Sequence, residues 1–371
     1  MQERKIALVL SGGGSRGAYQ CGVWQALTEL GIKIDIVVGV SVGAVNGAMV
    51  VQEDTVKTAN LWREMETDMI FDINAGAGLQ DYVKEFFINQ GAGTSGLEGL
   101  LRQYVDEEVI RSSPMDFGLV VTEIPSMKGR YLWKEDIPAG QLYDYITASA
   151  AAFPAVHPVE IDGRYYIDGG YEDNLPVTMA LEKGATEVIA VYLDAVGRFR
   201  PSELTEVPNL TFIESKWNLG DFLVFDTANA KRILRIGYLD AMKTFGVFDG
   251  GYYTFAKGAF DRKTLRQADC AARIFDLDPL TLYRRRHFSE ALAAAVTRAR
   301  AEEPLSLDAV DLSGISKAAD SLKAAGKKAA ALFIADSLRE KSETSIFLSK
   351  YAPRLLKEEV AAAKLLARWE L

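Results

Sequence analysis

The chain has 371 residues, of which 49% are hydrophobic and 25% charged, and its formal net charge is −9 at pH 7. These values are those of a globular protein with a full-sized core, built as one large domain with an appendage or as two domains. The negative charge argues against a nucleic-acid-binding protein. Two cysteines, Cys21 and Cys270, provide no disulfide framework and fit a reducing compartment.

No targeting or membrane-spanning segment is predicted. The apolar run at residues 6–10 is shorter than the core of a signal peptide and leads directly into glycines. No segment approaches the roughly 20 apolar residues that span a bilayer. We therefore expect a cytoplasmic protein, with peripheral membrane contact as an option. The two histidines and two cysteines offer no obvious zinc site, and we expect no cofactor.

The first elements of the chain alternate between strands and helices. Apolar and β-branched runs predict strands at residues 5–10 and 34–40, and helical spacing predicts helices at 16–30 and 42–52. A helical crossover between short buried strands implies a parallel sheet with right-handed connections.

More strands follow, and then the pattern changes. The later strands are predicted at 117–122, 129–133, 158–161, 165–167, 187–193 and 209–213, the last of which we expect to end the series. The third and fourth of these are joined by Asp162-Gly163, a strong signal for a hairpin. Helical periodicity and alanine dominate residues 228–245 and the chain from 280 onward. We therefore predict two regions, 1–250 and a mainly helical 251–371.

Three consecutive glycines follow the first predicted strand. Gly12-Gly13-Gly14-Ser15-Arg16-Gly17 satisfies the pattern G-x-G-x-x-G of dinucleotide-binding loops, which is weak on its own. That reading requires an acidic residue at the end of the next strand to hold a ribose. The next strand ends at Ser41, and Asp35 lies at its opposite end. The sequence therefore disfavours a dinucleotide site.

A second glycine-flanked turn lies between the predicted strand 34–40 and helix 42–52. Gly39, Ser41 and Gly43 form G-x-S-x-G, which in this context presents a nucleophilic serine on a sharp turn. Side chains at the two glycines would collide with the neighbouring strand and helix. The alternative is a purely structural one, a glycine-rich turn with a helix-capping serine.

Adjacent parallel strands end at one edge of a sheet, so Gly12 to Gly14 should face Ser41. Backbone N–H groups there would stabilise the oxyanion formed when a hydroxyl attacks an ester. Arg16 would add positive charge, lock the loop or form a structural salt bridge.

The base that would activate Ser41 is expected to be a carboxylate. An α/β-hydrolase places its serine after more than two strands, and it needs a histidine. His287 lies in a basic stretch and His157 between prolines, so both are poor candidates. Asp168 instead ends a predicted hairpin strand and is followed by Gly169 and Gly170, which allow close approach. The alternative for Asp168 is an ordinary turn aspartate.

These motifs together resemble the patatin-like phospholipases, over roughly residues 5–194. The shared features are the GGGSRG loop, the GVSVG turn, the DGG at Asp168, residues 147–158, and Asn174 with Pro176. The resemblance implies a three-layer α/β/α sandwich with a mostly parallel sheet. It also implies hydrolysis of lipid acyl esters by a Ser41–Asp168 dyad without histidine, with Gly12, Gly13 and Gly14 as the oxyanion loop.

Alternatives remain open for the activity and for the rest of the chain. A nonspecific carboxylesterase or thioesterase, or a catalytically silent lipid-binding protein, would fit the same fold. Aromatic segments at 219–225, 245–248 and 252–255 could line an acyl pocket, touch a membrane or pack in a core. The sequence does not indicate an oligomeric state.

The basic tail at 313–371 could bind anionic lipid or dock on the catalytic domain, and we favour docking. Its apolar stripe is expected on one helix face and consists of Leu322, Ala325, Ala329, Leu332 and Phe333.

Overall fold

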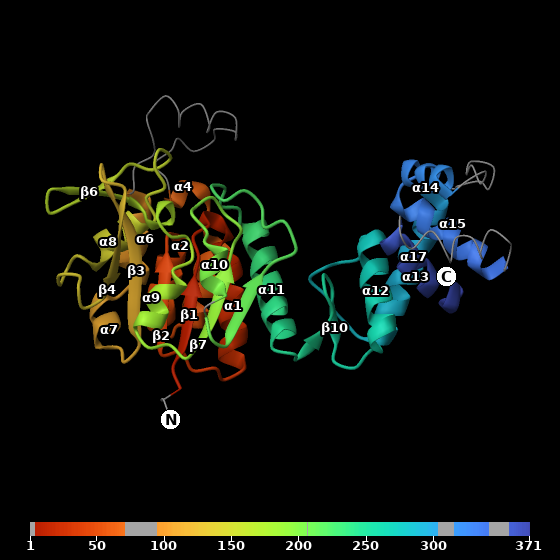
Figure 1. The fold of residues 1–371 in the computed structure, drawn as a ribbon, viewed down its shortest axis with the longest axis horizontal. Helices are drawn as coiled ribbons and strands as arrows, with labels where there is room; N and C mark the ends of the chain where they lie inside the picture. The colour runs from red at the N-terminus through yellow and green to blue at the C-terminus, as the bar shows by residue number, and fades with distance from the viewer. Residues whose placement is uncertain (1–3, 71–94, 206, 303–314, 341–355) are drawn as a thin grey trace. The chain divides into compact units, whose positions relative to one another are not determined.

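The computed structural model of this chain describes residues 4–70, 95–205, 207–302, 315–340 and 356–371. The chain divides into two compact units, Met1–Thr244 and Phe245–Leu371 (Figure 1). Among the described helices, none combines the length and the apolar composition that crossing a bilayer requires.

The first unit is built on one mixed sheet of eight strands in the order β5-β6-β3-β2-β1-β7-β8, with β4 also paired to β3. Strands β3, β2, β1, β7 and β8 pair in parallel, β4 and β6 each pair antiparallel with β3, and β5 pairs antiparallel with β6. The strands are β1 Ile6–Leu10, β2 Ile36–Val40, β3 Asp116–Ile124, β4 Lys128–Trp133, β5 Val159–Ile161, β6 Arg164–Asp168, β7 Glu187–Tyr192 and β8 Leu210–Glu214.

Helices cover both faces of this sheet. Its helices are α1 Gly17–Glu29, α2 Val42–Val51, α3 Thr55–Glu64, α4 Thr67–Ile70, α6 Ser95–Tyr104, α7 Glu107–Ser112, α8 Leu142–Ser149, α9 Val177–Glu182, α10 Pro201–Leu204 and α11 Thr227–Thr244, with short 3-10 turns η1 Gly14–Arg16 and η2 Gly169–Tyr171. On one face Val9 and Val38 pack against Met179 of α9. On the other face α2 packs so closely that a Cβ at Gly47 would lie 3.1 Å from Val37. The predicted three-layer α/β/α sandwich is confirmed (Figure 1).

The sequence pattern predicted β1 and β2 correctly because these two strands are fully buried. Each residue of β1 and β2 is buried, as expected for strands covered on both faces. Asp35, which lies just before β2, accepts a hydrogen bond of 2.8 Å from the N–H of Ile6, the first residue of β1. This carboxylate lies at the opposite end of β2 from Ser41 and is structural, in agreement with the rejection of a dinucleotide site.

The second unit combines a small three-stranded sheet with helices. Its elements are β9 Phe248–Asp249, β10 Thr254–Ala256, α12 Arg262–Ile274, β11 Leu282–Tyr283, α13 Arg285–Glu302, α14 Ile315–Ala324, α15 Lys327–Glu340 and α17 Lys357–Trp369. The prediction that 209–213 is the last strand was therefore wrong. Three strands follow it, and each is only two or three residues long, which is too short for hydrophobic periodicity to reveal.

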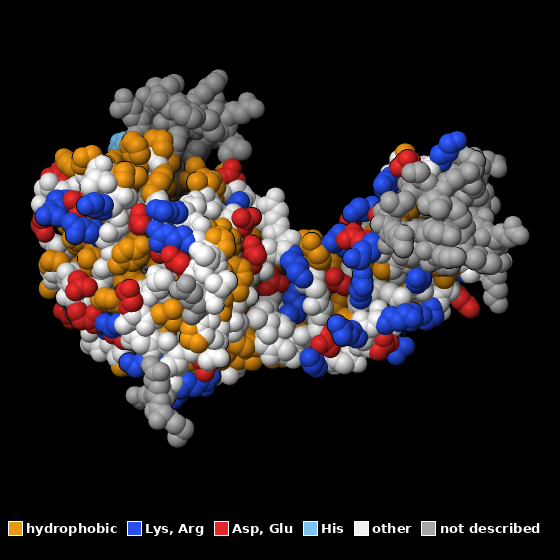
Figure 2. Space-filling view, in the orientation of Figure 1, with side chains coloured by type: hydrophobic (Ala, Val, Ile, Leu, Met, Phe, Trp, Pro, Cys, Tyr) orange, Lys and Arg blue, Asp and Glu red, His pale blue; other side chains and the backbone are white. Residues whose placement is uncertain are grey.

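The apolar stripe of the tail packs inside the second unit. Leu322, Ala329, Leu332 and Phe333 are buried, and Ala325 is half-buried. The prediction that the stripe lies on one helix was wrong, because Gly326 adopts a φ of +89° and divides the segment into α14 and α15. Helix α15 packs on α13 and α17, and α17 packs on α12. Basic and acidic side chains are interspersed on the visible face of this unit (Figure 2), and some form ion pairs, as Arg273 does with Glu358.

Candidate active site

Ser41 lies on a strained turn between β2 and α2. Its φ of 56° and ψ of −130° are unusual for a residue with a side chain. The turn is held by a relay of hydrogen bonds, in which the N–H of Ser41 donates to Oγ of Ser149 at 3.0 Å. The Ser149 hydroxyl in turn donates to the carbonyl of Val120 at 2.7 Å. The backbone of this turn is therefore tied both to α8 and to β3.

The glycines that flank Ser41 are required by the tightness of the turn. A Cβ at Gly39 would lie 2.1 Å from the carbonyl oxygen of Gly43, and a Cβ at Gly43 would lie 2.2 Å from that of Leu10. Side chains at either position would force the strand and the helix apart. The G-x-S-x-G spacing is thus a steric requirement of this strand-to-helix turn.

The glycine loop after β1 lies directly against this turn. A Cβ at Gly12 would lie 3.0 Å from Cβ of Ser41 and 2.5 Å from Oδ1 of Asn174. Gly14 has a φ of +54°, and a Cβ there would lie 2.0 Å from the carbonyl oxygen of Phe222. At Gly13 the added atom would collide with Leu193. The bare backbone allows the loop to fit between the serine turn, the residues after β7 and the segment before α11.

The three amides of this loop differ in their hydrogen bonding. The N–H of Gly12 donates to Oδ1 of Asn174 at 3.1 Å. Among the described residues, no acceptor is found for the N–H groups of Gly13 and Gly14. Within the described part of the chain, two backbone donors of this loop are therefore free to bind an oxygen, and the third is committed to a side chain.

Arg16 locks this loop to its neighbours. Its guanidinium donates to the carbonyl oxygens of Gly220 at 2.9 Å, Leu193 at 3.1 Å and Asp194 at 2.6 Å. Of the roles considered from the sequence, the geometry matches that of a lock. The next glycine, Gly17, is needed for packing, because a Cβ there would lie 2.5 Å from Val42.

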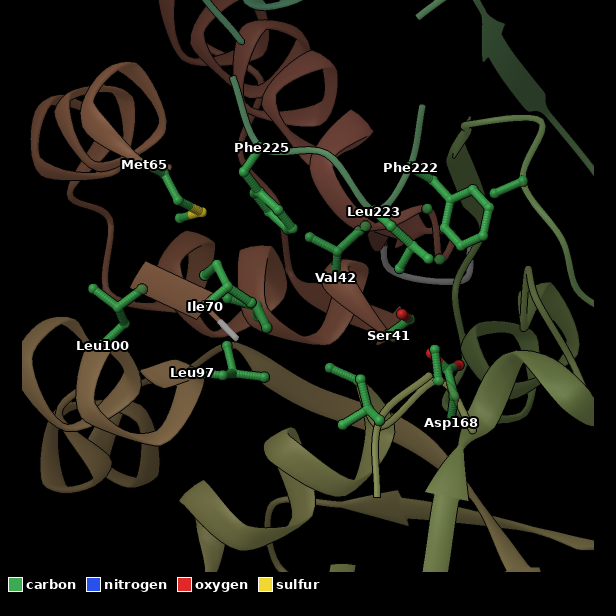
Figure 3. Close-up of a pocket in the computed structure, with 18 of the residues that line it drawn as sticks. Ser41, Val42, Met65, Ile70, Leu97, Leu100, Asp168, Phe222, Leu223 and Phe225 are labelled. Carbon is green, nitrogen blue, oxygen red and sulfur yellow. The ribbon is translucent and has the colours of Figure 1, made fainter. Parts of the chain in front are cut away.

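Asp168 ends β6 and faces Ser41. Its Oδ1 accepts a hydrogen bond of 2.7 Å from the N–H of Gly170, and its oxygen atoms point toward the hydroxyl of Ser41 (Figure 3). Burial raises the pKa of this carboxyl to about 6, although the Ser41 hydroxyl and the Gly170 N–H oppose the shift. Gly169 allows the approach of β3, since a Cβ there would lie 2.1 Å from the carbonyl oxygen of Val120. At neutral pH Asp168 is an ionised carboxylate within reach of a serine proton.

Ser41 and Asp168 lie at one end of an elongated apolar cavity. In Figure 3 their oxygen atoms point toward each other, and apolar side chains continue away from them to Leu97 and Leu100 of α6. The wall is assembled from α2, α3, α4, α6 and the segment before α11. The labelled apolar residues are Val42, Met65, Ile70, Leu97, Leu100, Phe222, Leu223 and Phe225. Such a channel suits an apolar chain whose reactive group sits at the polar end.

Neither histidine is among the described residues that line this cavity. His157 is exposed, and His287 is exposed in the second unit, where its ring packs on Tyr283. Burial raises the pKa of the Cys21 thiol to about 12, as expected for a packing residue. No group of three or more His, Cys, Asp or Glu side chains in the described part of the chain could hold a metal ion.

Sequence reasoning did not assign roles to several residues of the site. Asn174 and Ser149 were noted only as parts of a resemblance, because their contacts join segments far apart in the chain. The cavity wall from α3, α4 and α6 carries no motif. Of the three roles considered for residues 219–225, the structure supports the lining of a pocket, since Phe222, Leu223 and Phe225 line the cavity. Residues 252–255 instead pack in the second unit, where Phe255 is fully buried.

Comparison with known proteins finds a matching family. Residues 8–181 match the family described as patatin-like phospholipase. This part of the chain is therefore similar to the patatin-like phospholipases, as the motifs predicted.

Individual relatives match only in part. Patatin-like phospholipase domain-containing protein 7 of Rattus norvegicus is 32% identical over 192 residues, which cover 50% of this chain and 13% of that protein. Lysophospholipase NTE1 of Saccharomyces cerevisiae is 29% identical over 231 residues, covering 57% of this chain and 12% of that protein. The chain thus spans a small part of these relatives' length.

Among solved structures, VipD from Legionella pneumophila aligns with a TM-score of 0.44 and 15% identity, covering 99% of this chain and 91% of that chain. A likeness of this size supports no argument about the present chain.

Proposed function

We propose that the chain is a lipid acyl hydrolase in which Ser41 is the nucleophile and Asp168 the general base. The observation that carries this proposal is the placement of the Ser41 hydroxyl opposite the buried Asp168 carboxylate at the end of an apolar cavity. A base with a pKa near 6 is ionised at neutral pH and is a better proton acceptor than an exposed aspartate.

The reaction has two steps. Oγ of Ser41 attacks the acyl carbonyl carbon while Asp168 accepts the hydroxyl proton. The bond from the carbonyl carbon to the alcohol oxygen then breaks, and Asp168 gives the proton to the departing alkoxide. Water next attacks the acyl-enzyme and transfers a proton to Asp168, which returns it to Oγ of Ser41 as the carboxylic acid leaves. Atoms and charge balance without a further reactant.

The oxyanion formed in each step is expected to bind the N–H groups of Gly13 and Gly14. Their lack of an acceptor among the described residues, and their place with Ser41 on the wall of one cavity, support this role. In the same loop, Gly12 leaves space for Ser41, and Arg16 holds the loop in place. Gly39, Gly43, Gly169 and Gly170 support the two reacting side chains through the close contacts described above.

The substrate class follows from the cavity and the family. An apolar channel behind the serine favours a fatty acyl chain over a small acyl group. Relatives named as lysophospholipases make phospholipids and lysophospholipids the first substrates to test. Val196, which lines the cavity, is 80% exposed. Phe153 and Tyr171 are exposed as well, and the Tyr171 hydroxyl donates to the carbonyl of Phe153. We expect this apolar rim to contact the lipid surface from which substrate is drawn.

Incubation with mixed phospholipids and lysophospholipids, followed by mass spectrometry of the products, tests this function. We expect released fatty acid and the matching deacylated lipid from wild type, and neither from Ser41→Ala. Leu97→Trp, which adds bulk at the far end of the cavity, should lower turnover of long-chain esters about tenfold relative to short-chain esters. Equal loss for both lengths would refute an acyl-binding role for the cavity, and an absence of wild-type products would refute lipid hydrolysis.

A further inference from the structure

Asn174 is held rigidly beside the candidate active site. It is 1% exposed, and its backbone N–H donates to the carbonyl of Arg198 at 2.9 Å. Its side chain is enclosed by glycines, because a Cβ at Gly12, Gly170 or Gly197 would lie 2.5, 2.8 or 2.7 Å from its atoms. The amide group therefore has one available place and orientation.

The orientation of the amide is fixed by its partner. The N–H of Gly12 donates to one end of it at 3.1 Å, and only the oxygen can accept, so that end is Oδ1. The opposite end is the NH₂ group, Nδ2. This nitrogen is buried, and no acceptor for it is found among the described residues. Buried polar groups without partners are rare and indicate a missing partner or a function.

Asn174, which carries the unused donor, lines the same cavity as the reacting groups. Asn174, Ser41 and Asp168 all line it, and the position of a Cβ at Gly12 would be 2.5 Å from Oδ1 of Asn174 and 3.0 Å from Cβ of Ser41. The amide thus lies within a few ångströms of the serine. During the proposed reaction, the acyl oxygen at this end of the cavity requires a hydrogen-bond donor.

The geometry points to Asn174 as a catalytic residue whose Nδ2 donates a hydrogen bond to the acyl carbonyl oxygen as it becomes an oxyanion. The inference rests on the proposed hydrolase function. Asn174 would complete the set of donors begun by the amides of Gly13 and Gly14, and its Oδ1 would keep Gly12 in position. An amide suits both tasks, because one end accepts and the other donates. An aspartate would offer no donor when ionised and would place a negative charge beside Asp168.

Two substitutions in the full chain separate donation from loop support. Asn174→Asp keeps the shape and the acceptor for Gly12 but loses the donor, whereas Asn174→Ala loses both. The matched control is Asn46→Asp, since Asn46 is equally buried but donates to Gly17 and Gln20 and accepts from Trp62. For each variant we would measure kcat and KM on a water-soluble ester. We would also measure the inhibition constant of a fatty-acyl trifluoromethyl ketone, which forms an oxyanion adduct with the serine.

We expect both Asn174 variants to lower kcat by about 10²-fold to 10³-fold and to weaken ketone inhibition by a similar factor, with KM nearly unchanged. Asn46→Asp should leave kcat and ketone inhibition within about threefold of wild type. Near-normal kcat in Asn174→Asp would overturn the inference, and so would a loss of kcat with unchanged ketone inhibition, which is the mark of a merely structural role.

A measurement on wild type covers the case in which a variant does not fold. With ¹⁵N-labelled asparagine, the side-chain amide protons of Asn174 should move downfield when the ketone adduct forms, and unchanged resonances would contradict the donation. Ester turnover and labelling of Ser41 by a fluorophosphonate are recorded on the same wild-type sample. If both are absent, the proposed hydrolase fails and this inference fails with it. If both are present and Asn174→Asp is as active as wild type, only the role of Asn174 is lost.

Discussion

The buried residues of the two units serve different purposes. The second unit has an aromatic core in which Phe288 packs edge-on against Phe255 at 5.2 Å and Phe260 at 5.7 Å between ring centroids. Contacts of this kind stabilise a fold without a demand on any one orientation of a polar atom. The first unit instead buries Asp168 and holds Ser41 in a strained conformation.

The contrast indicates where chemistry resides in this molecule. Around Ser41 the chain accepts a positive φ, a buried carboxyl and an amide nitrogen without a partner among the described residues, each of which costs stability. Such features persist when the surrounding fold is stable enough to hold them and when they serve a reaction. Among the described residues of the second unit, no nucleophile, base and free hydrogen-bond donors are found together in this way.

The largest effect is expected from Ser41→Ala. Loss of the nucleophile should lower kcat/KM for esters by about 10⁴-fold or more. The fold should remain, because Asp168 keeps its hydrogen bond from Gly170 and only one oxygen is removed. Ester kinetics and a thermal melt check both parts. Wild-type turnover in this variant would contradict the role of Ser41.

The next largest effect is expected from Asp168→Asn, which cannot accept the serine proton and should lose about 10³-fold in kcat. In wild type, kcat/KM should rise with pH and level off above an apparent pKa of about 6, since only the ionised carboxylate is a base. His157→Gln and His287→Gln are the controls and should retain activity. Loss of activity in either histidine variant, with the fold intact, would favour a histidine-dependent mechanism.

The titration of Asp168 should also change the stability of the fold with pH. The pKa of Asp168 is higher in the folded chain than its ordinary value of 3.8, so the folded state binds the proton more tightly. Its contribution to stability is present at acid pH and is lost as the pH rises through about 6. Asp168→Asn should therefore gain stability relative to wild type between pH 4 and pH 7. A constant difference across this window would show that Asp168 titrates normally.

A smaller loss of turnover is expected from Gly12→Ala. The added methyl group would press on Asn174 and Ser41 and should lower kcat by about 10²-fold by displacing the loop. The matched control is Gly99→Ala in α6, where a Cβ would meet no atom within 4 Å. This control should keep its activity and gain up to about 1 kcal/mol of stability. Equal activity in the two variants would refute the steric argument for the loop.

The smallest effect on turnover is expected from Phe288→Ala in the second unit. Removal of this fully buried ring should destabilise that unit by about 3–5 kcal/mol. Turnover of a water-soluble ester should stay close to wild type, because no residue of the second unit lines the cavity as described. Hydrogen exchange should accelerate in α12 and α13 and remain slow in β1 and β2. A large loss of turnover would show that the second unit supports the active site.

The sequence predicted most of the first unit for physical reasons that are visible in particular residues. The strand at 34–40 was found because its β-branched run is buried on both faces, and the turn at Ser41 because only glycine fits at Gly39 and Gly43. The cavity wall was not found, since Leu97 and Leu100 look like any other helix residues until α6 is placed. The spare donor of Asn174 depends on one hydrogen bond, from an amide 162 positions away, which no local pattern encodes.

The most direct test of the Ser41–Asp168 mechanism is to trap the acyl-enzyme. Wild-type protein would be mixed with a fatty-acyl ester, quenched in acid within one turnover, digested, and analysed by peptide mass spectrometry. We predict the mass of the acyl group on the peptide that contains Ser41, and none on the same peptide from Ser41→Ala. Turnover in wild type with the acyl group on another residue, or with no acylated peptide at all, would contradict the account.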